Sequence, residues 1–445
     1  MVNKFRRQRN QISPCAGATG RGAPTLTTQP SCWRIGTGSP HWFALDIATR
    51  FRYDVPPMQP DIANIFPELE KDLRLLHTTG LIPSQGIDEL IKNGHVSAPA
   101  DWPIGEDQIQ PASIDLRLGP VAYRVRASFL PGDQATVRDR IEELFMHEID
   151  LTTPAVLERG CVYIIPLLEE LRLPVQLSGK ANPKSTTGRL DVFTRLITDY
   201  SKEFERVTEG YKGKLYVEVV PKTFSILVRQ GTKLNQLRFV RGAPPPSDAA
   251  LDQLHSRETL VYLEGDEPAD AVISKGLWIS IDLQGRDSSE IIGYRAKRHA
   301  PLINLDLVDY YDPTDYWEVI RRPSNRSLIL NPDDFYILIS KEKVRVPPNY
   351  AAAMVAYDPS VGEFRIHYAG FFDPGFGYGS ADIKGTRAVL EVRSHEVPFL
   401  LEDGQRVGRL LYERLLTTPK KIYGVDIGSS YQCQELSLSK QFKRL

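Results

Sequence analysis

The chain has 445 residues, of which 41% are hydrophobic and 25% charged; this length predicts two or three globular units, and the composition excludes a fibrous or wholly disordered chain. Its 55 basic and 56 acidic side chains nearly cancel, so no overall positive field attracts nucleic acid. No apolar run approaches the roughly 20 residues of a membrane-spanning helix, and we expect neither nucleic acid nor membrane as a partner.

The N-terminal residues 1–57 differ in composition from the rest. They contain eight Lys or Arg and two acidic residues, and they are rich in Gly, Pro, Ser and Thr. This composition predicts disorder. We expect residues 1–70 to be a disordered extension, or a product of a start codon assigned upstream of Met58. An organelle transit peptide is a further alternative for an Arg-rich, acid-poor segment.

A short helix and then a series of strands are predicted after this segment. SQGIDELIKNG (84–94) predicts a helix with Ser84 as N-cap, acidic residues in the first turn and Gly94 as the stop. Short β-branched or aromatic runs bounded by Gly, Pro or polar residues predict strands. These runs are SIDLRL (113–118), CVYIIPL (161–167), KLYVEVV (214–220), FSILVR (224–229) and QLRFV (236–240).

Four cysteines are scattered along the chain without a CxxC pair. This spacing fits neither a disulfide framework nor a cysteine-rich zinc site, and it favours a reducing, cytoplasmic location. The cysteines are Cys15, Cys32, Cys161 and Cys433.

Four residue pairs recur at one spacing of 173 positions, each in a similar strand context. Such self-similarity predicts an internal duplication of an all-β unit. We expect residues 71–245 and 246–445 to be the two units, joined near the proline-rich GAPPPSD (242–248). The pairs are Tyr163 and Tyr336, Pro174 and Pro347, Glu218 and Glu391, and Gly231 and Gly404.

Two features of the first unit could carry chemistry. SGKANPKSTTGRL (178–190) combines small polar residues with cations and suits a loop or helix start that binds phosphate. It lacks the GxxxxGK[ST] spacing of a P-loop, and a polar connecting loop is the alternative. Glu218 lies within an apolar strand run, where a buried carboxylate is costly unless it is paired or used. An outward-facing glutamate on an edge strand is the alternative for Glu218.

Several runs occur in an order known from one family. The first unit contains QPASIDLRLG (110–119), SGKANPKSTTGR (178–189), GYKGKLYVEV (210–219) and RQGTKLNQLRF (229–239). The second unit contains FFDPGFG (371–377), RAVLEV (387–392) and LEDGQRVGRLLYE (401–413), and the tail is SYQCQELSLS (430–439). Together these motifs resemble the dCTP deaminase branch of the dUTPase superfamily, in its long, internally duplicated bacterial form. The tail resembles the family's C-terminal lid.

The resemblance implies a mainly β fold with two tandem dUTPase-like distorted β-barrel units and short helices. It implies hydrolytic deamination of dCTP to dUTP and ammonia, feeding dUMP and dTTP synthesis, in a trimer-based or pseudo-trimeric homo-oligomer. Mg²⁺ is expected to enter with the substrate triphosphate. No metal site is expected in the protein, because the HxE and PCxxC motifs of zinc deaminases are absent.

The resemblance also implies roles for single residues. Glu218 is the expected general base for a water that attacks C4 of cytosine, and Ser185 and Arg189 are expected beside that water. Lys184 stands where the family has Arg, which keeps the charge and loses the bidentate fork. The expected substrate-binding residues are Lys184, Asp199, Gln236, Asp373, Tyr431 and Gln434.

The two units depart from the family pattern in different ways. Residues 208–211 read TEGY where the family has Asp-Pro-Gly-Trp, whereas the second unit retains Asp-Pro-Gly at 373–375. The second unit reads YDPSVGEFR (357–365) in place of SxxxR, with Asp358 at the offset from Ser185. We therefore expect the first unit to hold the catalytic Ser, Arg and Glu. The second is expected to supply packing, the lid and sugar contacts.

Two other functions are compatible with the sequence. The first is dUTP diphosphatase activity, alone or combined with deamination, in which a carboxylate-activated water attacks phosphorus. The second is a non-catalytic, nucleotide-binding β oligomer.

Overall fold

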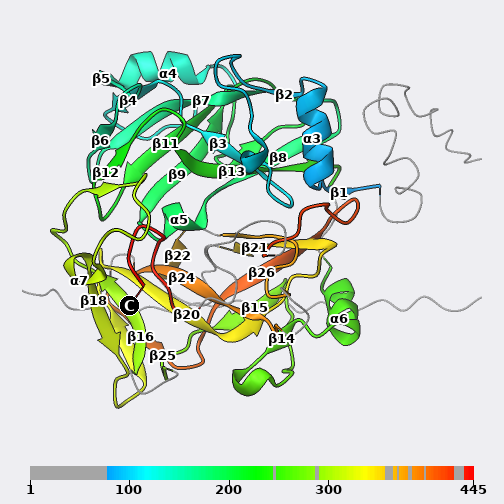
Figure 1. Cartoon of the computed structure of the whole chain (residues 1–445), viewed down its shortest axis with the longest axis vertical. Coiled ribbons are helices and arrows are strands. Elements are labelled where there is room, and N and C mark those ends of the chain that lie inside the picture. Colours follow the sequence, from blue (N-terminus) through cyan, green and yellow to red (C-terminus); the bar gives the residue numbers. More distant parts are fainter. Residues whose placement is uncertain are drawn as a thin grey trace, which may run out of the picture. The chain divides into compact units, whose positions relative to one another are not determined.

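The computed structural model describes residues 78–243, 247–285, 290–355, 364–367, 370–378, 383–394, 397–424 and 435–444. The extension predicted at residues 1–70 lies outside this range. Strands predominate and the helices are short (Figure 1), which confirms the predicted mainly β fold. In the part of the chain that the structure describes, no helix is long and apolar enough to cross a membrane.

The helix predicted near residue 84 is confirmed as α3 (Ser84–Lys92), although its predicted cap is wrong. Pro83 is the N-cap, Ser84 is already helical, and the first turn holds no acidic residue. Gly94 follows the helix with a φ of +71°, a left-handed conformation that favours glycine. The remaining helices are α4 (Val137–Leu144), α5 (Ser185–Gly188), α6 (Asp248–Arg257) and α7 (Pro313–Tyr316), with 3₁₀ turns η1 (Glu106–Gln108) and η2 (Glu264–Asp266).

The first half, residues 78–243, forms two main sheets, ordered β5-β4-β7-β11-β9 and β1-β13-β8-β10, with β3 also paired to β13. β11 lies between β7 and β9, and its run LYVEVV is buried on both faces, as continuous apolar strands are. The strands are β1 (Gly80–Leu81), β2 (Val96–Ser97), β3 (Ile114–Arg117), β4 (Val121–Val125), β5 (Phe145–Asp150), β6 (Ala155–Leu157), β7 (Val162–Arg172), β8 (Leu177–Pro183), β9 (Val192–Thr198), β10 (Arg206–Val207), β11 (Lys212–Pro221), β12 (Ile226–Val228) and β13 (Lys233–Arg241).

The second half repeats this strand order. Its sheets are ordered β18-β16-β20-β24-β22 and β15-β26-β21-β23, and β14 pairs with β20 as β2 pairs with β7. The strands are β14 (Val261–Tyr262), β15 (Leu277–Ser280), β16 (Ile291–Ala296), β17 (Ile303–Asn304), β18 (Trp317–Arg321), β19 (Ser327–Leu330), β20 (Phe335–Val344), β21 (Tyr350–Val355), β22 (Phe364–His367), β23 (Phe371–Phe372), β24 (Thr386–Ser394), β25 (Phe399–Glu402) and β26 (Arg406–Arg414).

The repeat extends to strand register. Glu218 on β11 lies opposite Ile164 of β7, and Glu391 on β24 lies opposite Ile337 of β20. The same tyrosine contact also recurs, because the Tyr163 hydroxyl accepts from the Glu158 amide and the Tyr336 hydroxyl accepts from the Asn331 amide. Each residue named for the second half lies 173 positions after its counterpart in the first half. The spacing found in the sequence therefore corresponds to equivalent backbone positions.

One apolar cluster of the compact unit Met58–Leu445 contains residues of both halves, and a second cluster belongs to the second half alone. β17 of the second half pairs in parallel with β12 of the first. Beside this pair, Phe224 packs edge-on against Tyr316 and Trp317, with ring centroids 5.9 and 5.5 Å away, and Phe442 of the C-terminal segment completes the aromatic group. The C-terminal segment is therefore part of the interface between the halves.

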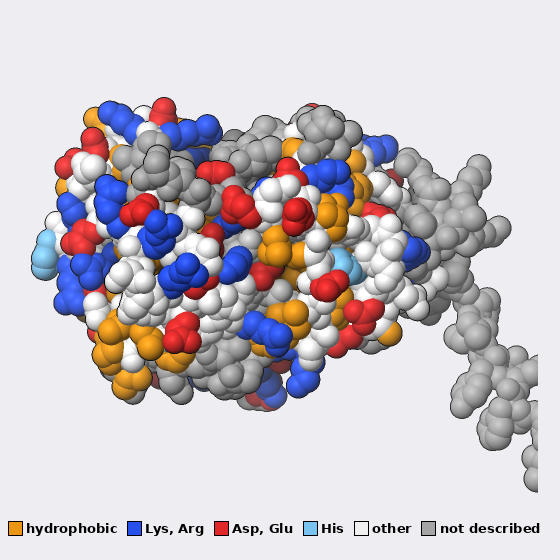
Figure 2. All heavy atoms as spheres, turned by 90° about the horizontal axis from the view of Figure 1, so that it is seen from below, with side chains coloured by type: hydrophobic (Ala, Val, Ile, Leu, Met, Phe, Trp, Pro, Cys, Tyr) orange, Lys and Arg blue, Asp and Glu red, His pale blue; other side chains and the backbone are white. Residues whose placement is uncertain are grey.

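The surface mixes both signs of charge. Figure 2 shows Lys and Arg side chains interspersed with Asp and Glu over much of the face that it presents. This distribution agrees with the near-zero net charge of the chain.

We predict that Phe224→Ala lowers the free energy of unfolding by about 3–5 kcal/mol, because it opens a cavity in the shared core. Val397 is the matched control: it lies 173 positions after Phe224 and is 52% exposed, against 1% for Phe224. Val397→Ala should change stability by less than about 0.5 kcal/mol. Urea unfolding measures both, and equal losses would contradict the assigned interface.

Candidate active site

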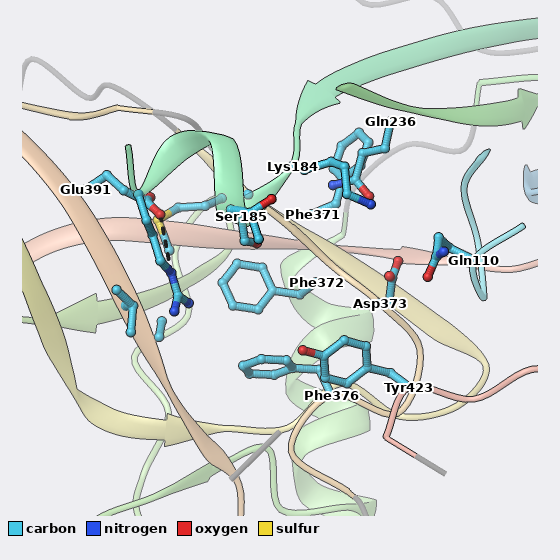
Figure 3. A pocket seen from close by; sticks show the side chains of 16 residues that line it. Gln110, Lys184, Ser185, Gln236, Phe371, Phe372, Asp373, Phe376, Glu391 and Tyr423 are labelled. Atoms are coloured by element: carbon cyan, nitrogen blue, oxygen red, sulfur yellow. Dashed lines mark ion pairs between the residues drawn. The ribbon is translucent and has the colours of Figure 1, made fainter. Parts of the chain in front are cut away.

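A cavity of 150 Å³ lies between the two halves and receives side chains from both. In the view of Figure 3, Glu391 lies on one side of Ser185, and Lys184 and Gln236 lie on the other. The first half contributes Gln110, Lys184, Ser185, Thr186, Arg189 and Gln236. The second half contributes Met354, Gly370, Phe371, Phe372, Asp373, Phe376, Ala388, Val389, Glu391 and Tyr423.

The predicted phosphate-binding segment forms the single helical turn α5. The Lys184 amide and the Thr187 hydroxyl both donate to the Leu234 carbonyl, at 2.9 and 3.0 Å, and thereby fix the turn to β13. Ser185 and Arg189 are four positions apart, so they lie on the same face of the turn. Both line the cavity, so the structure brings them together.

Arg189 is a buried cation at the centre of this site. Its side chain is 4% exposed, and its Nε lies 4.0 Å from Oε1 of Glu391, the ion pair drawn in Figure 3. Its Nη1 donates to the carbonyl and the hydroxyl of Ser437, each at 3.2 Å. The guanidinium therefore joins a carboxylate of the second half to the C-terminal segment.

Glu391 occupies the apolar strand β24 and is 7% exposed. Burial disfavours its ionised form and raises the pKa of Glu391 to about 8, with Arg189 partly opposing the shift. Such a carboxyl group exchanges a proton near neutral pH, as an acid–base catalyst must.

Glu218, which is expected beside Ser185 and Arg189, lies elsewhere in the described chain. Its Oε1 accepts from Nη2 and Nε of Arg195 on the neighbouring strand β9, at 2.6 and 3.0 Å, and it does not line the cavity. Arg195 in turn stacks on Phe204, with 3.5 Å from Cζ to the ring centroid. Glu218 is fully buried on a central strand, which also excludes the edge-strand alternative.

Three of the expected substrate-binding residues line the cavity, each with a polar partner. Lys184 Nζ pairs with Asp115, and the Gln236 side-chain oxygen accepts from the Ser113 hydroxyl at 3.3 Å. Asp373 pairs at 3.0 Å with Arg238, a fully buried cation on β13. Burial raises the pKa of Asp373, and Arg238 opposes that shift.

The other expected residues are not placed in the cavity. Asp199 accepts from the Val137 amide at 2.8 Å, so it lies at the start of α4 and outside the cavity lining. Tyr431 and Gln434 lie outside the described residues. Nearby in the C-terminal tail, the Ser439 hydroxyl donates to the Thr186 carbonyl at 2.9 Å. The described end of the tail therefore contacts α5.

Sequence reasoning missed the aromatic wall of the cavity and its support. Phe371, Phe372 and Phe376 belong to the FFDPGFG motif, of which only Asp373 is expected from the sequence to bind substrate. Gly375 within it has a φ of +93°, and a Cβ there would lie 2.3 Å from Ile422, beside Tyr423. The aromatic composition of the motif was the available signal, whereas nothing in the sequence singled out Arg238.

Comparisons with known proteins agree over both halves. Residues 78–243 match the family described as 2'-deoxycytidine 5'-triphosphate deaminase (DCD) N-terminal domain, and residues 247–442 match its C-terminal domain. A dCTP deaminase of Halorubrum lacusprofundi is 30% identical over 178 residues, or 39% of this chain and 81% of that protein. A "dCTP deaminase, dUMP-forming" of Parafrankia sp. is 32% identical over 148 residues, or 32% of this chain and 68% of that protein.

A solved structure is similar as well. The crystal structure of 2'-deoxycytidine 5'-triphosphate deaminase from Agrobacterium tumefaciens has 50% sequence identity and a TM-score of 0.72. The similarity covers 76% of this chain and 100% of that chain.

The raised pKa of Glu391 predicts a pH-dependent stability. Between about pH 4.3, where an unfolded Glu titrates, and about 8, the folded protein holds a proton that the unfolded chain lacks. The free energy of unfolding therefore falls as pH rises across this window, by up to about 1.4 kcal/mol per unit for this group. Glu391→Gln should remove that contribution.

Urea unfolding at about pH 5 and pH 8 measures the difference. The pKa of Glu205 is also raised to about 8 by burial, but this group titrates in both proteins and cancels in the comparison. A variant that loses as much stability as the wild type between the two pH values would contradict the buried state of Glu391.

Proposed function

Because the chain belongs to the 2'-deoxycytidine 5'-triphosphate deaminase family, we propose that it hydrolyses dCTP to dUTP and ammonia in the cavity between its halves. The observation that carries the proposal is the convergence of Ser185, Arg189 and Glu391 on that cavity. The repeated strand order supports an origin of the two halves by duplication of a dUTPase-like distorted β-barrel unit. A homo-oligomeric state stays a prediction.

Glu391 is the proposed general base, in place of Glu218. A water held between Glu391, Ser185 and Arg189 loses a proton to the carboxylate as its oxygen bonds to C4 of cytosine. Glu391 then returns that proton to the amino group, and the bond from C4 to the exocyclic nitrogen breaks. Ammonia leaves as C4 becomes a carbonyl, and the remaining proton of the attacking hydroxyl passes to N3 of the ring. Such acid–base help contributes about 10²- to 10⁴-fold. Arg189 supplies positive charge where the transition state develops negative charge.

The remaining lining residues suit a nucleotide. Phe372, Phe376 and Tyr423 offer apolar and aromatic surface to the nucleoside, and Asp373, held by Arg238, can accept a hydrogen bond from the sugar hydroxyl. Lys184 also lines an adjoining cavity of 310 Å³ with Lys233 and Lys440. Asp115 and Asp306 line it too, so lysines outnumber carboxylates by three to two. This cavity is the proposed place for the triphosphate, which brings Mg²⁺ with it.

A second candidate function is deamination combined with release of pyrophosphate, because relatives are named dUMP-forming. Incubating the pure protein with dCTP and Mg²⁺ while measuring ammonia and pyrophosphate separates the candidates. Ammonia alone supports the deaminase, and both products support the combined activity. A parallel incubation with dUTP completes the test: pyrophosphate from dUTP and no product from dCTP points to a dUTP diphosphatase. No product from either nucleotide points to a non-catalytic nucleotide-binding protein.

We predict that Glu391→Gln reduces ammonia release by roughly 10²-fold or more, because the amide cannot take a proton from water. Glu218→Gln is the matched control at the equivalent strand position. It should keep at least roughly a tenth of wild-type kcat per folded molecule, since Glu218 binds Arg195 away from the cavity. Steady-state kinetics on protein checked for folding decides the assignment, and the opposite ranking would return the role of base to Glu218.

Deletion of residues 435–445 should raise KM and lower kcat, because Ser437 and Ser439 hold Arg189 and α5. Deletion of residues 443–445 alone is the control, since it leaves Phe442 in the aromatic group. Kinetics with dCTP and a thermal melt measure both truncations. Unchanged kinetics in the longer deletion would show that the tail has no part in the site.

A further inference from the structure

A further ion pair crosses between the halves next to the cavity. Arg393 of β24 approaches Asp191 with its Nε, 3.2 and 3.3 Å from the two carboxylate oxygens, and its Nη2 also donates to Asp191. The Thr223 hydroxyl donates to Asp191 and accepts from Arg393 Nη2 at 2.9 Å. The side chains of Asp191 and Arg393 are 0% and 14% exposed, so solvent screens this pair little.

The position of this pair relates it to the site. Asp191 follows Arg189 by two residues, and Arg393 follows Glu391 by two residues on the same strand. Residues two apart on a strand point to the same face. One face of β24 therefore carries the anion Glu391 followed by the cation Arg393. Residues 189–191 carry the opposite order, the cation Arg189 followed by the anion Asp191, so each charge meets its opposite.

This alternation selects one alignment of the two segments. If β24 slipped by two residues against the segment after α5, Glu391 would face Asp191 or Arg393 would face Arg189. Two buried like charges in contact are strongly unfavourable. The pair of Asp191 and Arg393 therefore restricts where Glu391 can lie relative to Arg189.

The equivalent positions of the repeat lack the pair. The residue 173 positions before Arg393 is Val220, and the residue 173 positions after Asp191 is Phe364. Glu218, two residues before Val220, binds Arg195 of its own half. The ion pair between the halves thus lies beside Glu391, whereas the equivalent positions beside Glu218 hold the uncharged residues Val220 and Phe364.

We propose that Asp191 and Arg393, linked by Thr223, are positioning residues that hold Arg189 opposite Glu391 and so align the proposed base with its cation. The proposal rests on the proposed function, since it explains how the composite site is held. Neither residue lines the cavity. Their effect on catalysis therefore passes through Arg189 and Glu391.

Asp191→Asn and Arg393→Lys test the proposal without reversing a charge. Both variants weaken the bidentate contact, so we expect kcat per folded molecule to fall about tenfold to hundredfold while KM changes less. The pH profile is the decisive readout. If Arg189 moves away from Glu391, the acidic limb of kcat shifts to higher pH in both variants, because the cation that favours the ionised carboxylate is lost.

The direction of the shift separates positioning from a direct charge effect. Asp191→Asn removes a negative charge, which by itself would move the acidic limb to lower pH. Among the described side chains, Arg189 is the charged group paired with Glu391, and Lys184 and Asp373 line the same cavity. The backbone of His367 on β22 is opposite Glu391 in strand register. None of these groups is altered in either variant.

Glu169→Gln is the matched control. It breaks the buried Arg117–Glu169 pair, 2.8 Å long with side chains 9% and 0% exposed, which lies within the first half and away from the cavity. This variant should lose stability without moving the acidic limb. If folded Asp191→Asn or Arg393→Lys behaves in the same way, with wild-type kcat and pH profile, the positioning role is overturned. Should Asp191→Asn fail to fold, Arg393→Lys alone carries the test.

A measurement without substrate keeps the two proposals distinguishable. Hydrogen exchange of the amides at 185–191 should be faster in Arg393→Lys than in wild type, and unchanged in Glu169→Gln. If the wild type releases no ammonia from dCTP, the proposed function fails, whereas the exchange result still decides whether the pair holds α5. Equal exchange in all three proteins would overturn the positioning role whatever the activity.

Discussion

Buried charge at the junction of the halves must be paired, and this constraint governs the rest of the structure. Arg238 of the first half pairs with Asp373 of the second, and Asp191 of the first pairs with Arg393 of the second. Removing one partner of such a pair leaves an uncompensated buried charge, at a cost of about 3–5 kcal/mol. The halves are therefore held in one alignment. Between these closed pairs lies the wider Arg189–Glu391 pair, at 4.0 Å, where the cavity opens.

The repeat shows how one backbone supports two outcomes. Glu218 and Glu391 occupy equivalent strand positions, and both are buried. Arg195 on the neighbouring strand pairs directly with Glu218. Glu391 instead lines a cavity of 150 Å³ together with Arg189, a cation from the other half. The local partner, rather than the strand position, decides which carboxylate has room for water and substrate. Within the residues that the structure describes, the cavity at Glu391 is thus lined by both halves.

Much of the fold could be predicted from the sequence, because strand runs and their spacing are local signals. The predicted strand runs at 161–167, 214–220 and 236–240 lie in β7, β11 and β13. Residues 173 positions apart occupy the same strand register in the two halves. The choice between Glu218 and Glu391 could not be predicted, because it depends on Arg195 across a strand pair and on contacts between distant segments. The same reason explains Asp199, which caps α4 instead of lining the cavity. Ser185 and Arg189 were expected together because the family resemblance implies it, and the turn α5 accounts for this grouping, since residues four apart share a helical face.

The contacts of the C-terminal segment have a consequence for biosynthesis. Ser437 and Ser439 hold Arg189 and α5, and Phe442 joins Tyr316 and Trp317 in the shared core. Residues 437–442 follow both halves in the sequence, whereas domains fold from the N-terminus as the chain emerges from the ribosome. The first half can therefore form its sheets before Glu391 and the C-terminal segment exist. A nascent chain that has not yet reached residue 442 would be folded in part while its cavity is still incomplete.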